Sequence, residues 1–408
     1  MIDVKKIRPD FPMYRKGGLY KGLPLTYLDN AATTFKPECV IKAQDSYYLD
    51  FTANAHRGDY SLAHDVDVAY EGARKTVASF LNCAPEEVCF TSGDTMGLNE
   101  VCFGLAPYLK PGDEIVLSAE EHASNVLPWF VLAKRVGAKI VYAPLEDNRV
   151  TPETLSSVLT NKTKVVSLAS VSNVLGYALD VEGLAKKAHE AGALFVEDGA
   201  QSVPHRLTDV KKSDVDFLIF SGHKMCGPLG IGVLYGKRKL LEKMDPLLYG
   251  GEMNGRFYED GTFTYSDVPL KFEAGTQNIA GALGLARACQ YLSEIGMENI
   301  ASHERRLHDK AVSLLKQNKN ILLYNEDGDT GIVTFNVKDV FAQDVASYLS
   351  SKGVFVRSGQ HCAKLLNERL RCQATVRCSF YFYNDEEDVE RLAEACLHAE
   401  DFLDAFFA

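Results

Sequence analysis

Short apolar segments rich in β-branched residues alternate with longer amphipathic segments between about residues 88 and 236. Most of the short segments are almost continuously apolar, which is typical of strands that are covered on both faces. Repeated strand–helix–strand units predict an α/β fold with a mainly parallel, doubly wound sheet. The predicted strands lie at 88–92, 114–118, 139–143, 164–170, 193–198, 216–221 and 231–236, with helices at 95–109, 124–137 and 180–192.

The connection between the last two predicted strands is unusually short. Only residues 222–230 join strand 216–221 to strand 231–236, whereas a crossover between parallel strands needs about a dozen residues or more. We therefore expect at least one edge of the sheet to be antiparallel.

The pattern changes after residue 236. Residues 252–275 are rich in Gly, Tyr, Phe and Asp, which predicts a hairpin or a long loop, and 279–319 predicts a long helix broken near Gly296. The tail predicts a smaller α+β C-terminal domain, with strands at 321–325, 331–337, 354–358 and 375–383 and helices at 342–353 and 385–407. We expect three parts: an N-terminal segment (1–24) that packs with the small domain, a large domain (25–285) and the small domain (286–408).

Composition and charge narrow the range of functions. With 408 residues, 46% hydrophobic and 24% charged, the chain is neither disordered nor fibrous. Its net charge of −11 argues against nucleic acid or an anionic membrane as the main partner. No apolar run approaches the ~18 residues that span a bilayer, and the N-terminus lacks the apolar core of a signal peptide, so we expect a cytoplasmic protein.

The ten cysteines form no Cys-x-x-Cys pair, so metal-ligand spacing is absent and we expect no metal site. They are too sparse for a disulfide scaffold, which favours thiols in a reducing compartment.

Chemically useful side chains follow the ends of the predicted strands, where open α/β sheets bind their ligands. A small-residue turn before a helix, as at Asp94 and Thr95, suits a phosphate, although either residue could simply cap the helix. A carboxylate at the end of a buried strand, Asp198, needs a cationic partner such as a protonated ring nitrogen. A loop lysine among apolar residues, Lys224, can act as an amine nucleophile or base, although a single lysine is more often a surface residue. Together, a phosphate cradle, a carboxylate and a lysine match the requirements of pyridoxal phosphate.

The motifs resemble those of the class V aminotransferase family of fold-type I pyridoxal phosphate enzymes, and more closely the cysteine desulfurases of the Suf type (group II). The resemblance runs from Tyr27 to Asn384, and it is carried by Asp198-Gly199-Ala200-Gln201, Ser221-Gly222-His223-Lys224, Glu121-His122, Ser172-Asn173-Val174-Leu175-Gly176 and Phe272-Glu273-Ala274-Gly275-Thr276.

The resemblance implies a role for each matching residue in holding the cofactor. Lys224 carries its aldehyde, Asp198 pairs with its ring nitrogen and His122 stacks on its ring. Asn173 and Gln201 contact the ring's 3-hydroxyl. Thr95, Ser221 and His223 hold the phosphate, and Thr276 reaches the phosphate of a second subunit.

A second group of residues resembles the part of the family that accepts sulfur. Arg357-Ser358-Gly359-Gln360-His361-Cys362-Ala363 is similar to the segment that carries the catalytic cysteine, Cys362. The segment around Arg377 is similar to the one that holds the substrate carboxylate, with Arg357 and Asn173 beside it. A planar guanidinium suits that role because it binds a carboxylate through two hydrogen bonds. A buried structural thiol is the alternative for Cys362, but the Gly359-Gln360-His361 context indicates a turn.

One departure from the family pattern lies in the phosphate cradle. Position 94 is Asp where the family typically has Thr, and a carboxylate beside a phosphate dianion would repel it. Either Asp94 turns away to cap the helix, or phosphate binding relies on backbone N–H groups and Thr95.

The resemblance implies a homodimeric cysteine desulfurase that converts L-cysteine to L-alanine and leaves a persulfide on Cys362. A Suf-type acceptor protein would take the sulfur for iron–sulfur cluster assembly, and selenocysteine lyase activity is a plausible side reaction. The alternatives are an aminotransferase, a C–S lyase that releases sulfide without a persulfide, and a silent scaffold subunit. Retention of both Lys224 and Cys362 argues against the scaffold.

Overall fold

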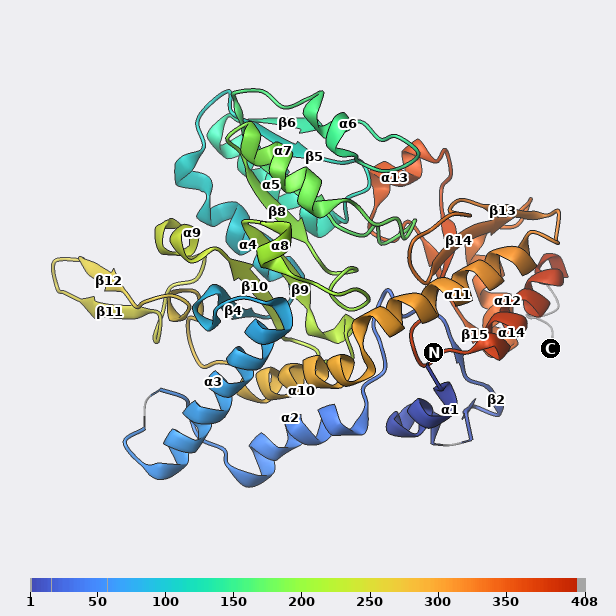
Figure 1. Ribbon diagram of the computed structural model, residues 1–408, viewed down its shortest axis with the longest axis horizontal. Helices are drawn as coiled ribbons and strands as arrows, with labels where there is room; N and C mark the ends of the chain where they lie inside the picture. The colour runs from blue at the N-terminus through green and yellow to red at the C-terminus, as the bar shows by residue number, and fades with distance from the viewer. Residues whose placement is uncertain (1, 16, 57, 402–408) are drawn as a thin grey trace.

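The computed structural model describes residues 2–15, 17–56 and 58–401 (Figure 1). Its centre is a seven-stranded sheet in the order β4-β10-β9-β8-β7-β5-β6. Strands β5 to β9 pair in parallel, as the alternation of segments predicts. The strands are β4 (Val88–Thr91), β5 (Glu114–Leu117), β6 (Lys139–Tyr142), β7 (Thr163–Ala169), β8 (Leu194–Asp198), β9 (Phe217–Ser221) and β10 (Gly232–Gly236).

The sheet is antiparallel at its β4 edge, as expected, although the strand that runs against its neighbours, β10, lies one place inside that edge. The short connection makes β10 antiparallel to β9, as expected, but β4 then pairs with the other side of β10. β4 therefore occupies the edge.

Each central strand contributes alternate side chains to two separate cores. On β9, Leu218 and Phe220 belong to one hydrophobic cluster, whereas Phe217 and Ile219 belong to the other. Both faces are covered, which explains the continuously apolar strands. The helices of this part are α3 (Ser61–Leu81), α4 (Asp94–Gly104), α5 (Leu127–Val136), α6 (Pro152–Ser156), α7 (Val181–Glu190), α8 (Val210–Ser213) and α9 (Arg238–Lys243).

Two long helices connect this sheet to the C-terminal part, and they break where the sequence predicts. Helix α10 (Ile279–Ile295) packs against α2 (Glu38–Asp50) and α3, and α11 (Met297–Leu315) continues toward the C-terminal sheet (Figure 1). Between them Gly296 has φ 92°, a conformation that favours glycine.

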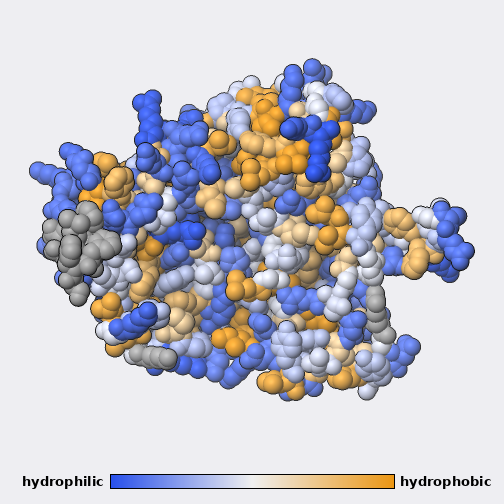
Figure 2. Space-filling view, turned by 180° about the vertical axis from the view of Figure 1, so that it is seen from behind, coloured by the Kyte–Doolittle hydropathy of each residue, from blue (hydrophilic) through white to orange (hydrophobic). Residues whose placement is uncertain are grey.

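The predicted hairpin after β10 is also present. Strands β11 (Asn254–Phe257) and β12 (Phe263–Tyr265) pair antiparallel and project from the body of the molecule (Figure 1). The same projection stands out in the space-filling view, where hydrophobic residues lie along it (Figure 2). Phe257 and Phe263 are both exposed there.

The C-terminal sheet is antiparallel, in the order β13-β14-β17-β16. Its own hydrophobic core joins α11 to α12 and α14. The strands are β13 (Ile321–Leu323), β14 (Ile332–Val337), β16 (Arg357–Gly359) and β17 (Thr375–Ser379), and the helices are α12 (Ala342–Ser351), α13 (Lys364–Arg369) and α14 (Glu386–Leu397). This arrangement confirms a mainly parallel sheet with a smaller α+β part.

Several predicted boundaries differ from the structure. The strand predicted at 354–358 is divided, because β15 (Val354–Phe355) leaves the C-terminal sheet and pairs in parallel with β3 (Thr26–Tyr27). The strand predicted at 375–383 ends at Ser379, where the chain turns to bury Tyr381 and Tyr383. The closing helix, predicted to residue 407, ends at Leu397, and residues 402–407 lie outside the described part of the chain.

The N-terminal segment contacts the C-terminal end of the chain. Arg8 forms ion pairs with Asp385 (2.8 Å) and Asp388 (2.6 Å), and the Phe11 ring lies 4.8 Å from that of Tyr383. This segment contains α1 (Val4–Ile7), β1 (Leu19–Tyr20) and β2 (Leu23–Pro24). Within the described residues, no helix combines the length and the apolar character needed to cross a bilayer.

Candidate active site

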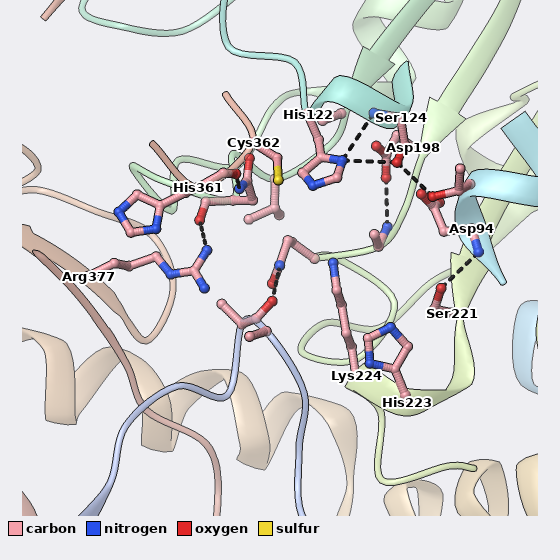
Figure 3. A pocket seen from close by; sticks show the side chains of 18 of the residues that line it. Asp94, His122, Ser124, Asp198, Ser221, His223, Lys224, His361, Cys362 and Arg377 are labelled. Carbon is pink, nitrogen blue, oxygen red and sulfur yellow. Dashed lines mark hydrogen bonds between the residues drawn. The ribbon is translucent and has the colours of Figure 1, made fainter. Parts of the chain in front are cut away.

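A cavity of about 230 Å³ lies at the carboxyl ends of the parallel strands, where they meet the C-terminal sheet. It brings together every predicted site residue except Thr276 (Figure 3). In this view Cys362 and Arg377 lie on one side of the Lys224 amine, and Asp94 and Asp198 lie on the other. The site residues in its lining are Asp94, Thr95, His122, Asn173, Asp198, Gln201, Ser221, His223, Lys224, Arg357, Cys362 and Arg377.

One end of the cavity is the turn between β4 and α4. Gly93 has φ 149°, and a Cβ at this position would lie 3.2 Å from Ser221 Oγ. The Asp94 N–H donates a hydrogen bond to Ser221 Oγ (2.8 Å), and the Thr95 and Ser124 hydroxyls lie 2.7 Å apart. Backbone N–H groups and hydroxyls at the start of an 11-residue helix suit a phosphate.

Asp94 does not turn away to cap the helix, which excludes the first of the two alternatives. It is the first residue of α4, and no side chain caps the helix. The side chain is only 7% exposed and lines the cavity, and its Oδ1 atom has no hydrogen-bond partner. Burial raises the pKa of Asp94, and the negative charge of Asp198 raises it further.

Asp198 and Lys224 face each other across this end of the site. Asp198 ends β8, and its Oδ1 atom accepts a hydrogen bond from the Ala200 N–H (3.0 Å). Lys224 belongs to the short 3₁₀ turn Gly222–Lys224 that follows β9. Burial lowers the pKa of Lys224, against the opposing effect of the Asp94 and Asp198 carboxyl groups. A lysine amine with a lowered pKa is suited to nucleophilic and base chemistry.

His122 enters the cavity from the loop after β5, and this loop is held by a buried carboxyl group. Glu121 accepts hydrogen bonds from Asn125 Nδ2 (2.7 Å) and the Ala169 N–H (2.8 Å). The His122 Nδ1 atom accepts the Ser124 N–H (3.2 Å), which fixes the orientation of the ring. Burial lowers the pKa of His122 and so favours a neutral ring that can stack on a planar ligand.

Arg377 lies on β17 and is fully buried at the other side of the cavity. Its Nη1 donates to the Asn173 carbonyl (2.8 Å) and its Nη2 to Asp29 Oδ1 (3.2 Å), while its Nε atom has no partner. Burial lowers the pKa of Arg377, and the neighbouring Asp29 carboxylate opposes this effect. A guanidinium with a donor left over is suited to a carboxylate ligand.

Cys362 lies on a tight turn between β16 and α13. His361 and Cys362 both have left-handed φ angles, 51° and 57°, which is uncommon for residues other than glycine. Three hydrogen bonds hold the turn: Ala123 N–H to the Cys362 carbonyl (2.8 Å), Asn173 Nδ2 to the His361 carbonyl (2.8 Å), and one between His361 Nε2 and Thr375 Oγ1 (2.9 Å). Of the ten cysteines, all in the described part of the chain, only Cys362 is exposed.

Thr276 lies apart from the cavity. It is exposed, and it borders a second cavity that Glu100 and Phe272 also line. Glu273, three residues before Thr276, is anchored, because its carboxylate binds Arg74 (2.6 Å) and accepts a hydrogen bond from the Phe90 N–H (2.8 Å). The reach of Thr276 into a second subunit stays a prediction.

Three polar residues at the site, Asp29, Ser124 and His361, were given no role by the sequence analysis. His361 stands within the Arg357–Ala363 motif, Asp29 follows Tyr27 by two residues, and Ser124 follows His122 by two. Their roles depend on contacts with Arg377, Thr95 and Thr375, which are distant in the chain. The sequence offers no sign of those contacts.

Unpaired polar atoms test whether pyridoxal phosphate fits this cavity. Five buried side-chain atoms of the lining have no hydrogen-bond partner: Asp94 Oδ1, Gln201 Oε1, His223 Nδ1, His361 Nδ1 and Arg377 Nε. Buried polar groups are nearly always paired, so such a cluster indicates a polar ligand. A lysine, a carboxyl group and a helix N-terminus accompany them, so the residues present fit the cofactor.

Comparisons with known proteins agree with this geometry. The model of the aminotransferase class-V family matches residues 26–392. A cysteine desulfurase of Haloferax volcanii is 43% identical, with 97% of this chain and 96% of that protein covered. The crystal structure of the cysteine desulfurase CsdA of Escherichia coli has a TM-score of 0.91 at 36% identity, covering 98% of this chain and 99% of that one. The apo cysteine desulfurase of Thermococcus onnurineus has a TM-score of 0.91 at 37% identity, covering 97% of both chains. The chain therefore belongs to the class-V aminotransferase family, alongside relatives that are cysteine desulfurases.

Proposed function

We propose that this protein is a pyridoxal phosphate-dependent cysteine desulfurase. It converts L-cysteine to L-alanine and transfers the sulfur to Cys362 as a persulfide. The observation that carries the proposal is the position of Cys362, an exposed thiol that lines the same cavity as Lys224 and Arg377.

The cofactor would be held at the strand ends. Lys224 would carry it covalently, Asp198 would pair with its ring nitrogen, and His122 would cover one face of its ring. The start of α4, Ser221 and His223 would bind its phosphate. When bound, pyridoxal phosphate supplies a conjugated ring that accepts the electron pair left at the substrate's Cα.

Arg377 binds the substrate carboxylate in this proposal, with Arg357 at the rim. Arg377 lines the cavity and its Nε atom has no hydrogen-bond partner, while Asp29 and the Asn173 carbonyl fix the other two nitrogens. The guanidinium is therefore oriented before the substrate arrives, which reduces the entropy cost of binding.

Lys224 then acts as the base that removes the proton from Cα. Its lowered pKa means that the amine gives up its proton more readily than an exposed lysine, so a larger fraction is ready to accept one. Cys362 Sγ attacks the substrate sulfur, so that a sulfur–sulfur bond forms while the Cβ–sulfur bond breaks. Cβ takes up a proton and Lys224 returns one to Cα, so the products are alanine and a Cys362 persulfide, which balances protons, sulfurs and electrons.

The proposal also covers the oligomeric state of the protein, the protein that accepts its sulfur, and its location in the cell. The active form would be a homodimer in which Thr276 completes the phosphate site of the other subunit, and an acceptor protein of the Suf type would remove the sulfur from Cys362 for iron–sulfur cluster assembly. All ten cysteines are free, which supports a reducing compartment such as the cytoplasm.

Product analysis tests the function directly. The purified protein, loaded with pyridoxal phosphate and supplied with L-cysteine and a reductant, should release equal amounts of alanine and sulfide without an added keto acid. Pyruvate in place of alanine would identify a C–S lyase, and a requirement for a keto acid would identify an aminotransferase. The same assay with selenocysteine measures the side activity.

A further inference from the structure

The turn that carries Lys224 is held from outside by one short segment of the N-terminal part of the chain. The backbone bonds inside the turn converge on the Gly222 carbonyl. The His223 carbonyl before the lysine and the Cys226 N–H after it are left to partners elsewhere. Both groups bond to residues 33–36, an extended segment that precedes α2.

The Thr34 hydroxyl joins the two sides of Lys224. Its Oγ1 atom accepts the Cys226 N–H (2.9 Å) and donates its own proton to the His223 carbonyl (3.1 Å), which is the pairing that a hydroxyl allows. The Thr34 N–H donates to the same carbonyl (3.1 Å). Thr34 is only 2% exposed, so its loss would leave the Cys226 N–H buried without a partner.

Lys36 supports the same carbonyl with a charged donor. Its Nζ atom donates to the His223 carbonyl (3.0 Å), to Thr33 Oγ1 (3.2 Å) and to the Thr34 carbonyl, three acceptors for the three protons of an ammonium group. Hydrogen bonds from a charged donor are stronger than those between neutral groups. Neither Thr34 nor Lys36 lines the cavity, so both act there through the turn.

The same segment reaches back to the proposed substrate arginine. Arg377 Nη2 donates to Asp29 Oδ1 (3.2 Å). Residues 29–36 therefore contact both the guanidinium that would hold the substrate carboxylate and the turn that carries the proposed base. The substrate's Cα is bonded to its carboxylate carbon, so the spacing of these two groups decides whether Lys224 Nζ reaches the Cα proton.

We propose that Thr34 is a positioning residue for Lys224: its hydroxyl fixes the peptide groups on both sides of the lysine and so aims the free amine at the Cα proton. This inference rests on the proposed function and deepens it. While Lys224 is bonded to the cofactor, that bond restrains its side chain. Once the amine is free to act as the base, the turn alone holds it in place. Loss of the hydroxyl should therefore slow proton removal more than it weakens the binding of cofactor or substrate.

Two substitutions separate the hydroxyl from the bulk of the Thr34 side chain. Thr34→Val keeps the shape and removes the hydroxyl, whereas Thr34→Ser keeps the hydroxyl. Thr163→Val is the matched control, because Thr163 is also buried and its Oγ1 atom also accepts a backbone N–H, that of Thr160 (3.0 Å). Thr163 begins β7, whereas the cavity lies at the other end of that strand.

Each full-length variant is loaded with pyridoxal phosphate, and alanine is measured in a single turnover with L-cysteine and with L-cysteine deuterated at Cα. We expect Thr34→Val to form alanine about tenfold more slowly at saturating cysteine, with a deuterium isotope effect at least as large as that of the wild type. Its half-saturating cysteine concentration and its affinity for the cofactor should stay within about threefold of the wild type. Thr34→Ser and Thr163→Val should stay within about threefold in all three quantities.

Hydrogen exchange provides a readout that needs neither cofactor nor turnover. In the cofactor-free protein the Cys226 N–H should exchange about tenfold faster in Thr34→Val than in the wild type, and Thr34→Ser should restore its protection. If Thr34→Val does not fold, Lys36→Met takes its place, because it removes a donor from the same carbonyl. That variant should slow alanine formation about threefold or more.

A wild-type rate in Thr34→Val, or in Lys36→Met where it serves as the replacement, would overturn the inference. Equal losses in Thr34→Val and Thr34→Ser, a slower reaction without an isotope effect, or unchanged exchange at Cys226 would also overturn it. A higher half-saturating concentration at an unchanged rate would assign Thr34 to substrate binding instead. A wild-type protein that makes no alanine would overturn the proposed function, whereas exchange at Cys226 would still show whether Thr34 holds the turn, so the two failures are distinguishable.

Discussion

The backbone N–H of Ala123 donates a hydrogen bond to the carbonyl oxygen of Cys362. This contact links the loop that carries His122 to the turn that carries the exposed thiol. The strained φ angles of His361 and Cys362 persist because such contacts hold the turn from outside.

Replacing Ala123 with proline should remove this contact with little other change. Ala123 begins a 3₁₀ helix, and the preceding His122 has φ −63° and ψ 148°, a conformation that tolerates a following proline. We expect Ala123→Pro to bind the cofactor normally but to form the Cys362 persulfide at least tenfold more slowly, because the thiol is no longer held in position. Ala123→Gly keeps the N–H and is the control, and equal persulfide formation in both variants would show that the contact is dispensable.

Cys362→Ser should separate cofactor binding from sulfur transfer. A serine hydroxyl is nearly the same size but almost wholly protonated at neutral pH, and it cannot form a persulfide. The variant should keep the cofactor absorption and bind cysteine, yet yield little alanine and no protein-bound sulfane sulfur. Labelling the wild type after one turnover should locate the persulfide on Cys362. Label on the half-buried Cys372 would identify a different nucleophile.

Arg377→Ala should chiefly weaken the binding of cysteine. Removal of one partner from a buried charge pair costs about 2–5 kcal/mol, which would appear as a higher KM. The loss includes the effect on Asp29, which is left without its main partner. Arg357→Ala is the comparison, because the Arg357 side chain is 47% exposed and its nearest approach to Asp29 is 3.9 Å. An unchanged KM in Arg377→Ala would place the carboxylate elsewhere.

Glu120 should make the protein less stable as the pH rises. Burial, and then the neighbouring Glu121, raise the pKa of Glu120 to about 8, above the ~4.3 of an unfolded glutamate. The folded state therefore binds the proton more tightly, and its stabilisation is complete below about pH 4 and is lost as the pH rises toward about 8. Glu120→Gln should raise the melting temperature at pH 8 but not at pH 4. The exposed Glu182→Gln should change neither.

Mixing two inactive variants tests the shared site. If Thr276 completes the phosphate site of a second subunit, a heterodimer of Lys224→Ala and Thr276→Ala chains contains one intact site. Activity should then return on mixing, toward about a quarter of the wild-type level if chains exchange freely and each intact site works independently. A fully active monomer in sedimentation experiments would contradict the shared site.

The sequence was sufficient to predict those strands and helices that can be recognised from their own residues alone. Alternate residues of β9 enter opposite cores, so the strand is apolar throughout and could be recognised without the structure. The residues at the ends of β8 and β9 could likewise be assigned to one site, because parallel strands bring their carboxyl ends together. The domain boundaries stay a prediction.

Non-local relationships could not be predicted in this way. Asp29 and Arg377 are 348 residues apart, and their contact depends on the bridge between Asp29 and Ser379 at the C-terminal sheet. The position of β10 inside the sheet depends on β4, more than a hundred residues earlier. The burial of Asp94 follows from the packing of α4 against β9 and β10, which no residue pattern reveals.

The exposure of a single thiol has a practical consequence for chemical labelling. Thiol reagents react with thiolates, and burial raises the pKa of the half-buried Cys83 to about 12, while it also raises the pKa values of Cys39 and Cys372. An alkylating reagent added briefly to the folded protein should therefore consume one equivalent per chain, at Cys362. The unmodified protein can be counted, immobilised or fitted with a fluorophore at its sulfur-accepting position without the removal of any other cysteine.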